Sequence, residues 1–196
     1  TKRLNEATLK SARLENQLLK KSIQPHFVLN SLTSLQELIE QQPKKASLFV
    51  EDLSEVFSVF SKVCEHKLIT IKEELNLVNS FLKVMSVRMD KKFNLSIHNL
   101  NGEELIPPGV LLTLIENGVT HGFENQVVGQ FIITKELERN ATVFTIDNNG
   151  VSPSEIKEGL GLQYVRSRLE EAFGSHFNLE LKKLEHGFRT KITVTT

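Results

Sequence analysis

The sequence predicts an α+β protein in two parts, an N-terminal helical hairpin and a sandwich of helices on a mostly antiparallel sheet. Three observations support this prediction. Apolar residues up to about residue 63 recur every three, four or seven positions, which is a helical period. After about Thr70 several short runs alternate instead, as strands do. Helical and strand-like segments then follow one another in mixed order, which is typical of α+β folds. We place the hairpin at 1–63, a linker at 64–70 and the sandwich at 71–196.

The composition excludes several classes of protein. The chain has 196 residues, of which 39% are hydrophobic and 24% charged, as in an ordinary soluble globular protein. Basic and acidic residues balance at 24 each, so a nucleic-acid partner is not expected. The one cysteine, Cys64, cannot form an internal disulfide, which favours a reducing, cytoplasmic compartment. Because the chain starts at Thr1 without a methionine, we interpret it as a fragment of a longer protein.

A proline interrupts the first predicted helix without ending its apolar pattern. Proline inside a helix costs about 3 kcal/mol, so its retention at Pro25 calls for a reason. The next residue, His26, lies just off the apolar seam, and Ser22 and Asn30 stand four residues to either side of it. This spacing predicts a polar stripe that solvent can reach. The seam steps by seven through the proline: Leu18, Pro25, Leu32 and Ile39.

A second helix is predicted to start at Pro43, where the missing N–H is harmless, and to run to about Val63. Two helices bury too little apolar surface to be stable alone. We therefore expect the hairpin to pair with a second copy into a four-helix bundle, which makes the protein a homodimer. The alternative is that the hairpin packs on the rest of its own chain.

The second part has a regular alternation of predicted elements. Turns rich in glycine, proline and asparagine separate them. The predicted helices are 72–89, 110–121 and 160–173, and the predicted strands are 93–97, 130–134, 142–146, 177–181 and 190–194.

Three polar segments of this second part are candidates for a binding site. On the helix 110–121, Glu116, Asn117 and His121 share one side, and oxygen ligands of this kind suit Mg²⁺. Asp-Asn-Asn-Gly at 147–150 ends a predicted strand, and Gly-Leu-Gly-Leu at 159–162 enters a helix whose free amides suit phosphate. Each segment alone has an ordinary explanation as an exposed helix face, a turn or a helix entry.

The order and spacing of the three segments resemble the asparagine box and the two glycine boxes of the GHKL-type ATP-binding fold, which histidine kinases share with gyrase and MutL. The first half resembles the LytS-type sensor histidine kinases. It has Pro-His-Phe-x-x-Asn on a helix, Ile-x-x-Glu-Glu-Leu at 71–75, then Arg88 and Ile-Pro-Pro at 106–108. The resemblance covers the chain from about residue 15 onward.

The resemblance implies a role for each matching position. His26 corresponds to the histidine that takes the γ-phosphoryl group of ATP and passes it to an aspartate of a response-regulator receiver domain, and Asn30 to the asparagine downstream of it. Asn117 corresponds to the residue that binds Mg²⁺, with the catalytic Glu116 beside it. ATP and Mg²⁺ are the implied cofactors. The implied nucleotide-binding residues are Asn117, His121, Gly122, Asn148, Gly150, Gly159, Leu160, Gly161 and Leu162.

The resemblance also implies where the chain works. It corresponds to the cytoplasmic domain of a bacterial inner-membrane sensor, which reaches the membrane only through upstream segments. A hinge near 64–70 would let the ATP-binding part swing onto the histidine. The helix after the second glycine box carries Arg166 and Arg168, for which we weigh a solvated face against a phosphate contact.

The chain departs from the family pattern at the first glycine box. An aspartate there normally accepts the amino hydrogen of adenine. With Phe144 and Ile146 pointing inward, alternation puts Asn148 on the inner face and Asp147 outward. An asparagine carbonyl accepts that hydrogen bond without the help of charge, and Ser152 replaces the second glycine of this box, so we expect weaker ATP binding.

Two other functions stay open at this point. One is a catalytically weak pseudokinase or ATP-responsive dimeric signalling scaffold, which the change at Asn148 favours. The other is an ATPase of the same fold, or a serine kinase that acts on an anti-sigma antagonist, which leaves the helix of His26 without a role. Phosphohistidine on the protein would distinguish the kinase from both.

Overall fold

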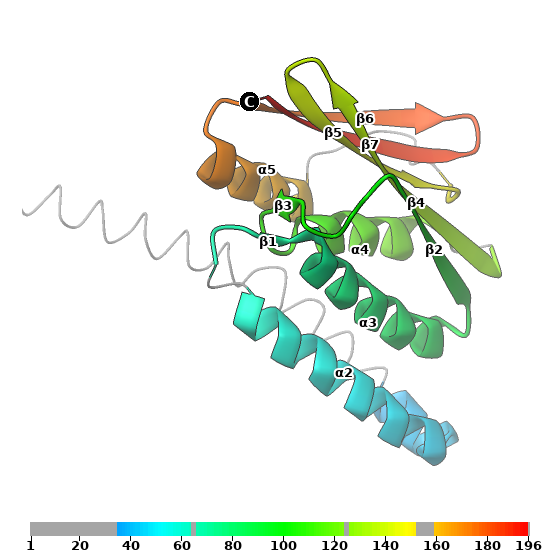
Figure 1. Ribbon diagram of the computed structural model, residues 1–196. Coiled ribbons are helices and arrows are strands. Elements are labelled where there is room, and N and C mark those ends of the chain that lie inside the picture. The colour runs from blue at the N-terminus through cyan, green and yellow to red at the C-terminus, as the bar shows by residue number, and fades with distance from the viewer. Residues whose placement is uncertain (1–34, 64–65, 124–125, 152–158, 196) are drawn as a thin grey trace, which may run out of the picture.

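A computed structural model describes residues 35–63, 66–123, 126–151 and 159–195 (Figure 1). Within them, the helices are α2 (Pro43–Val63), α3 (Ile71–Met89), α4 (Val110–Gly122) and α5 (Leu160–Phe173). The strands of the main sheet are β2 (Lys92–His98), β4 (Val128–Glu138), β5 (Ala141–Asn148), β6 (Phe177–Leu184) and β7 (Gly187–Thr195). A separate antiparallel pair joins β1 (Ile69–Thr70) to β3 (Leu105–Ile106). None of the helices in these ranges is long and apolar enough to cross a membrane.

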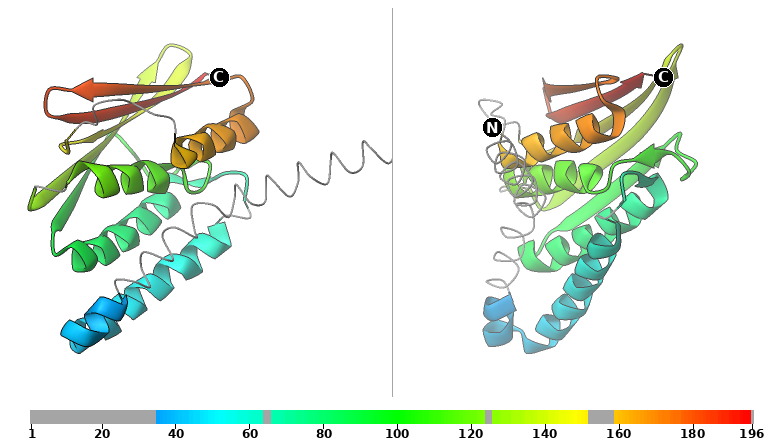
Figure 2. Two further views of the ribbon diagram at one scale, coloured as in Figure 1. Left: turned by 180° about the vertical axis from the view of Figure 1, so that it is seen from behind. Right: turned by 90° about the vertical axis from the view of Figure 1, so that its left-hand side faces the viewer.

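The main sheet is mixed, with the order β2-β4-β5-β7-β6. β2 and β4 are parallel, and the other neighbouring strands are antiparallel. Helix α4 lies in the connection between the two parallel strands, as such a crossover requires. The prediction of helices on one face of a mostly antiparallel sheet is confirmed, because α4 and α5 cover one face and α3 lies beside α4 (Figures 1 and 2).

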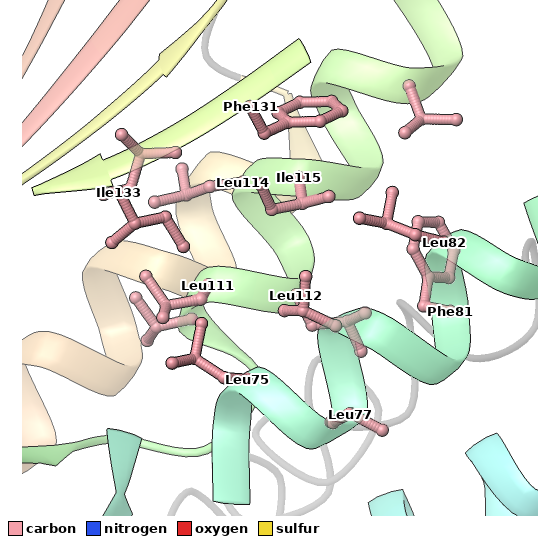
Figure 3. Packing of buried hydrophobic residues seen from close by; sticks show 14 of the residues in the cluster. Leu75, Leu77, Phe81, Leu82, Leu111, Leu112, Leu114, Ile115, Phe131 and Ile133 are labelled. Atoms are coloured by element: carbon pink, nitrogen blue, oxygen red, sulfur yellow. The ribbon is translucent and has the colours of Figure 1, made fainter. Parts of the chain in front are cut away.

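The core lies between the sheet and these helices. Figure 3 shows Leu114 and Ile115 of α4 beside Phe131 and Ile133 of β4, with the labelled residues of α3 on the far side of α4. Phe131 and Ile133 are buried while the intervening Ile132 is exposed, which is the alternation of a strand with one covered face. At one end of this core, Phe123 packs edge-on against Phe131 and Phe93, with ring centroids 5.4 and 5.7 Å apart. This cluster holds the C-terminal end of α4 against the sheet.

The second helix packs on its own chain. α2 has the predicted bounds, and its inner face lies along α3 on the side away from the sheet (Figure 1). This is the arrangement that the sequence left open as the alternative to a four-helix bundle. Residues 35–41 are helical, but the earlier part of the predicted hairpin lies outside the described residues, so the bundle and the homodimer stay predictions. The buried residues of α2 are Ala46, Phe49, Leu53 and Val56.

The segment that follows α2 is bonded to the sandwich. The carbonyl of His66 accepts a hydrogen bond from Nη2 of Arg168 in α5 at 3.0 Å. Ile69 is buried and pairs with Ile106 in the short β1–β3 ladder. Thr70 then caps α3, since its hydroxyl accepts from the amide of Glu73, whose carboxylate accepts from the Thr70 amide in return. Within the predicted linker, His66, Ile69 and Thr70 thus have defined contacts with the sandwich.

Candidate functional site

The N-terminus of α4 is capped by a side chain from another helix. The N-cap residue, Gly109, has a positive φ of 80° and no side chain to offer. Glu74 of α3 takes that role, because its carboxylate accepts from the amides of Gly109 at 2.9 Å and Leu112 at 3.1 Å. From α5, the Tyr164 hydroxyl donates to the carbonyl of Pro108 at 3.1 Å. Helices α3 and α5 therefore both fix the start of α4.

Glu74 is fully buried, and this burial raises the pKa of its carboxyl from 4.5 to about 7, although the backbone amides and the charge of Arg168 oppose the shift. The folded state then binds this proton more tightly than the unfolded state. The protonated carboxyl of Glu74 therefore adds to the free energy of unfolding. This contribution is fully present below pH 4.5 and is lost as the pH rises through about 7.

We expect the free energy of unfolding of the wild type to fall by about 3 kcal/mol relative to Glu74→Gln between pH 4.5 and 8, since glutamine does not titrate. Urea unfolding at a series of pH values measures this difference. Glu73→Gln is the matched control, because the exposed neighbour has a lowered pKa and its loss should leave the decline in place. Parallel pH profiles for the wild type and Glu74→Gln would contradict the prediction.

Two polar residues of the predicted site lie side by side further along α4. Glu116 is largely buried, which raises the pKa of its carboxyl to about 7, while the positive charge of Arg88 opposes the shift. Asn117 is half-buried and faces the start of α5. A Cβ atom added at Gly161 would lie 3.0 Å from Asn117 Nδ2 and 3.1 Å from its Oδ1. The absence of a side chain at Gly161 thus leaves room for the Asn117 amide.

The end of β5 meets the same helix. A Cβ atom at Gly118 would lie 3.3 Å from Nδ2 of Asn148, and one at Gly150 would lie 2.8 Å from the Cα and carbonyl oxygen of Gly122. The amide of Val151 donates to that carbonyl at 2.7 Å. The three segments that the sequence singled out therefore converge on one stretch of α4, and glycines make the close approach possible.

The register at the end of β5 is the one expected from alternation. Phe144 and Ile146 are in the core, and Asn148 lies on their side of the strand against α4. Asp147 lies on the opposite face, where its carboxylate accepts two hydrogen bonds from Arg189 of β7 at 2.7 and 2.6 Å. Asp147 therefore does not point toward α4.

The remaining predicted residues are only partly placed. Gly159 is exposed in extended backbone, and a Cβ atom there would meet nothing within 4 Å. Leu160 is exposed and Leu162 is partly buried. The side chain of His121 lies outside what the structure describes, as do the following residues: Pro25, His26, Asn30 and Ser152.

Arg168 differs from both interpretations that its sequence position allowed. It is buried, its Nη1 is 2.9 Å from a carboxylate oxygen of Glu171, and its Nη2 donates to the carbonyl of His66. It is therefore neither on a solvated face nor among the residues around Asn117. Its charge also acts on Glu74.

The role of Glu74 was also missed from the sequence, although one observation pointed to it. Thr70 and Glu73 form the capping box pattern, which places Glu73 at the helix surface. Glu74 follows Glu73 and so lies about 100° further around the helix, on the side of α3 that faces the core.

Comparisons with known proteins identify relatives of the chain. Residues 14–93 match the family model of histidine kinases. The chain is 26% identical over 185 residues to the sensor histidine kinase BtsS of Escherichia coli, a match that covers 92% of this chain and 33% of BtsS. It is 27% identical over 208 residues to the sensor histidine kinase/phosphatase LytS of Staphylococcus aureus, covering 95% of this chain and 34% of LytS. The chain thus spans about a third of the length of these relatives.

Solved structures of low sequence identity share the fold. A bacterial phosphotransferase matches with a TM-score of 0.60 at 13% identity, over 91% of this chain and 96% of its own. The histidine kinase AdeS of Acinetobacter baumannii matches with a TM-score of 0.52 at 14% identity, over 89% of this chain and 97% of its own. The recognition made from the motifs is confirmed: the chain is a relative of the sensor histidine kinases LytS and BtsS, and residues 14–93 carry the histidine kinase pattern.

Proposed function

We propose that the chain is the core of a two-component sensor histidine kinase, which phosphorylates itself on His26 from a Mg²⁺–nucleoside triphosphate and passes the phosphoryl group to an aspartate of a response regulator. The observation that carries this proposal is the close approach of two other segments to neighbouring residues of α4, Gly161 to Asn117 and Asn148 to Gly118. The sensor kinase relatives support the same activity.

The residues present suit the phosphate and metal end of such a substrate. Asn117 and Glu116 supply oxygen atoms, which Mg²⁺ prefers, and the ion would neutralise the phosphate charge during transfer. Gly161 allows the start of α5, where backbone amides point out of the helix end, to approach Asn117 closely. In the proposed reaction an imidazole nitrogen of His26 attacks the γ-phosphorus, the bond to the bridging oxygen breaks and the nucleoside diphosphate leaves. A homodimer through the helices of residues 1–63 and a receiver-domain partner belong to this proposal.

The test is the chemistry of the phosphorylated protein. The chain is incubated with Mg²⁺ and γ-labelled ATP or GTP, and the labelled protein is then treated with acid and with base. We expect label that is lost in acid, is stable in base and moves to an aspartate of an added receiver domain. Binding of nucleotide without any labelling would contradict the kinase and support the second candidate.

That second candidate is a signalling scaffold of the same fold that transfers no phosphoryl group. Asn148 is the observation in its favour, because the resemblance calls for an aspartate at this position. A scaffold would bind nucleotide and change its dimer contacts while the protein stays unlabelled.

A further inference from the structure

The side-chain amide of Asn148 has a defined orientation. Its Oδ1 accepts a hydrogen bond from the backbone amide of Gly150 at 3.0 Å. Gly150 is buried, so its N–H needs an acceptor. Only the oxygen of the Asn148 side-chain amide can accept, so Oδ1 and not Nδ2 is the atom next to Gly150. Nδ2 therefore points the other way, toward Gly118 of α4, and has no hydrogen-bond partner among the described residues. The turn presents an unpaired donor next to the helix of Asn117.

An aspartate at this place would present the opposite group. One carboxylate oxygen would accept from Gly150 and the other would remain as an acceptor for a ligand. In Asn148 the second position is an NH₂ group, which only donates. Asparagine in place of aspartate therefore puts a hydrogen-bond donor where an acceptor would face the ligand.

Among the described residues, the side-chain oxygens on either side of Asn148 do not take the place of this acceptor. The carboxylate of Asp147 is on the other face of the sheet, bound to Arg189. Oδ1 of Asn149 accepts from the amide of Gln130 at 2.7 Å, and the carbonyl of Asn149 accepts from Gln126 Nε2 at 3.0 Å. The side-chain oxygens at 147, 148 and 149 are all engaged within the protein.

We propose that Asn148 makes this site select nucleoside triphosphates whose base has a carbonyl oxygen at position 6, as in guanine and hypoxanthine, over those with an amino group there, as in adenine. The inference rests on the proposed function and on the resemblance, which implies that residue 148 contacts position 6 of the base. Nδ2 donates to the 6-oxo group, whereas the 6-amino group of adenine would place two donors against each other. A mispaired polar contact of this kind lowers affinity about 10- to 100-fold.

Direct binding tests the proposal independently of any kinase activity. Non-hydrolysable analogues of ATP, GTP and ITP are titrated into the chain with Mg²⁺ in a calorimeter. We expect the GTP and ITP analogues to bind at least about tenfold more tightly than the ATP analogue. The ITP analogue separates the 6-oxo group from the 2-amino group, because hypoxanthine has only the former.

Two variants complete the test. Asn148→Asp should reverse the preference in favour of the ATP analogue. Asn149→Asp adds the same charge one residue away, where an oxygen still accepts from Gln130, and should leave the preference unchanged. Tighter binding of the ATP analogue by the wild type, or the same ratio in Asn148→Asp, would overturn the proposal. Failure of the wild type to bind any of the three analogues would also overturn it, regardless of what Asn148→Asp binds. The kinase itself fails separately, if nucleotide binds and no phosphohistidine forms.

Discussion

Replacing His26 with alanine is expected to abolish phosphoryl labelling of the chain completely while nucleotide binding stays at the wild-type level. The proposed reaction forms a bond between phosphorus and an imidazole nitrogen, and alanine offers no nucleophile at that position. Residue 26 belongs to the predicted N-terminal hairpin and the proposed binding residues to the sandwich, so the variant should separate the two activities. Labelling with γ-labelled nucleotide and calorimetric binding are measured on the same preparation.

The matched control removes a different histidine. His98 lies exposed on β2, and His98→Ala should keep both labelling and binding. Label that persists in His26→Ala would show that His26 is not the acceptor. Equal loss of label in His98→Ala would show that the loss in His26→Ala is not specific to that histidine.

The second large effect is expected at Gly161. A side chain there would enter the space of the Asn117 amide, since its Cβ would stand only 3.0 Å from Nδ2 and 3.2 Å from Cγ2 of Thr113. Gly161→Val should therefore displace Asn117 and lower the affinity for the Mg²⁺–nucleotide by about 10- to 100-fold, because the loss of one polar contact to a charged group costs roughly 1.5–3 kcal/mol. Calorimetric titration measures the affinity, and thermal unfolding shows whether the variant is folded.

Gly159 is the control that the structure provides. The resemblance treats Gly159 and Gly161 alike, as the two glycines of one box, but a Cβ at Gly159 meets nothing within 4 Å and its backbone is extended. Gly159→Val should bind nucleotide within a few-fold of the wild type. Equal losses in the two variants would mean that the contact with Asn117 is not the reason for a glycine at 161.

Much of the fold was predictable because its signals are local. Pro43 marks the start of α2, and Gly159 directly precedes α5; both helices have the predicted bounds. Every predicted strand lies within an observed one, since alternation is strong where one face is covered. β1 and β3 were missed because two-residue strands have no period and exist only through their pairing with each other.

The candidate site was predictable as a set of segments but not as a set of contacts. The sequence identified the three boxes, and the alternation in β5 correctly separated Asn148 from Asp147. The orientation of the Asn148 amide could not follow from the sequence, because it depends on the turn that brings the Gly150 amide to Oδ1. Similarly, nothing local shows that Gly161 and not Gly159 touches Asn117.

The sequence by itself determined the order of the elements, the identity of the box residues and the relation to sensor histidine kinases, because periodicity and motif spacing are properties of the chain. The tertiary structure decided which groups meet. It packs α2 on α3, assigns Glu74 the cap of α4 and Arg168 the carbonyl of His66, and turns the donor of Asn148 toward α4. These outcomes depend on burial and on the hydrogen bonds that buried polar groups require, which join residues as far apart in the chain as Arg168 and His66.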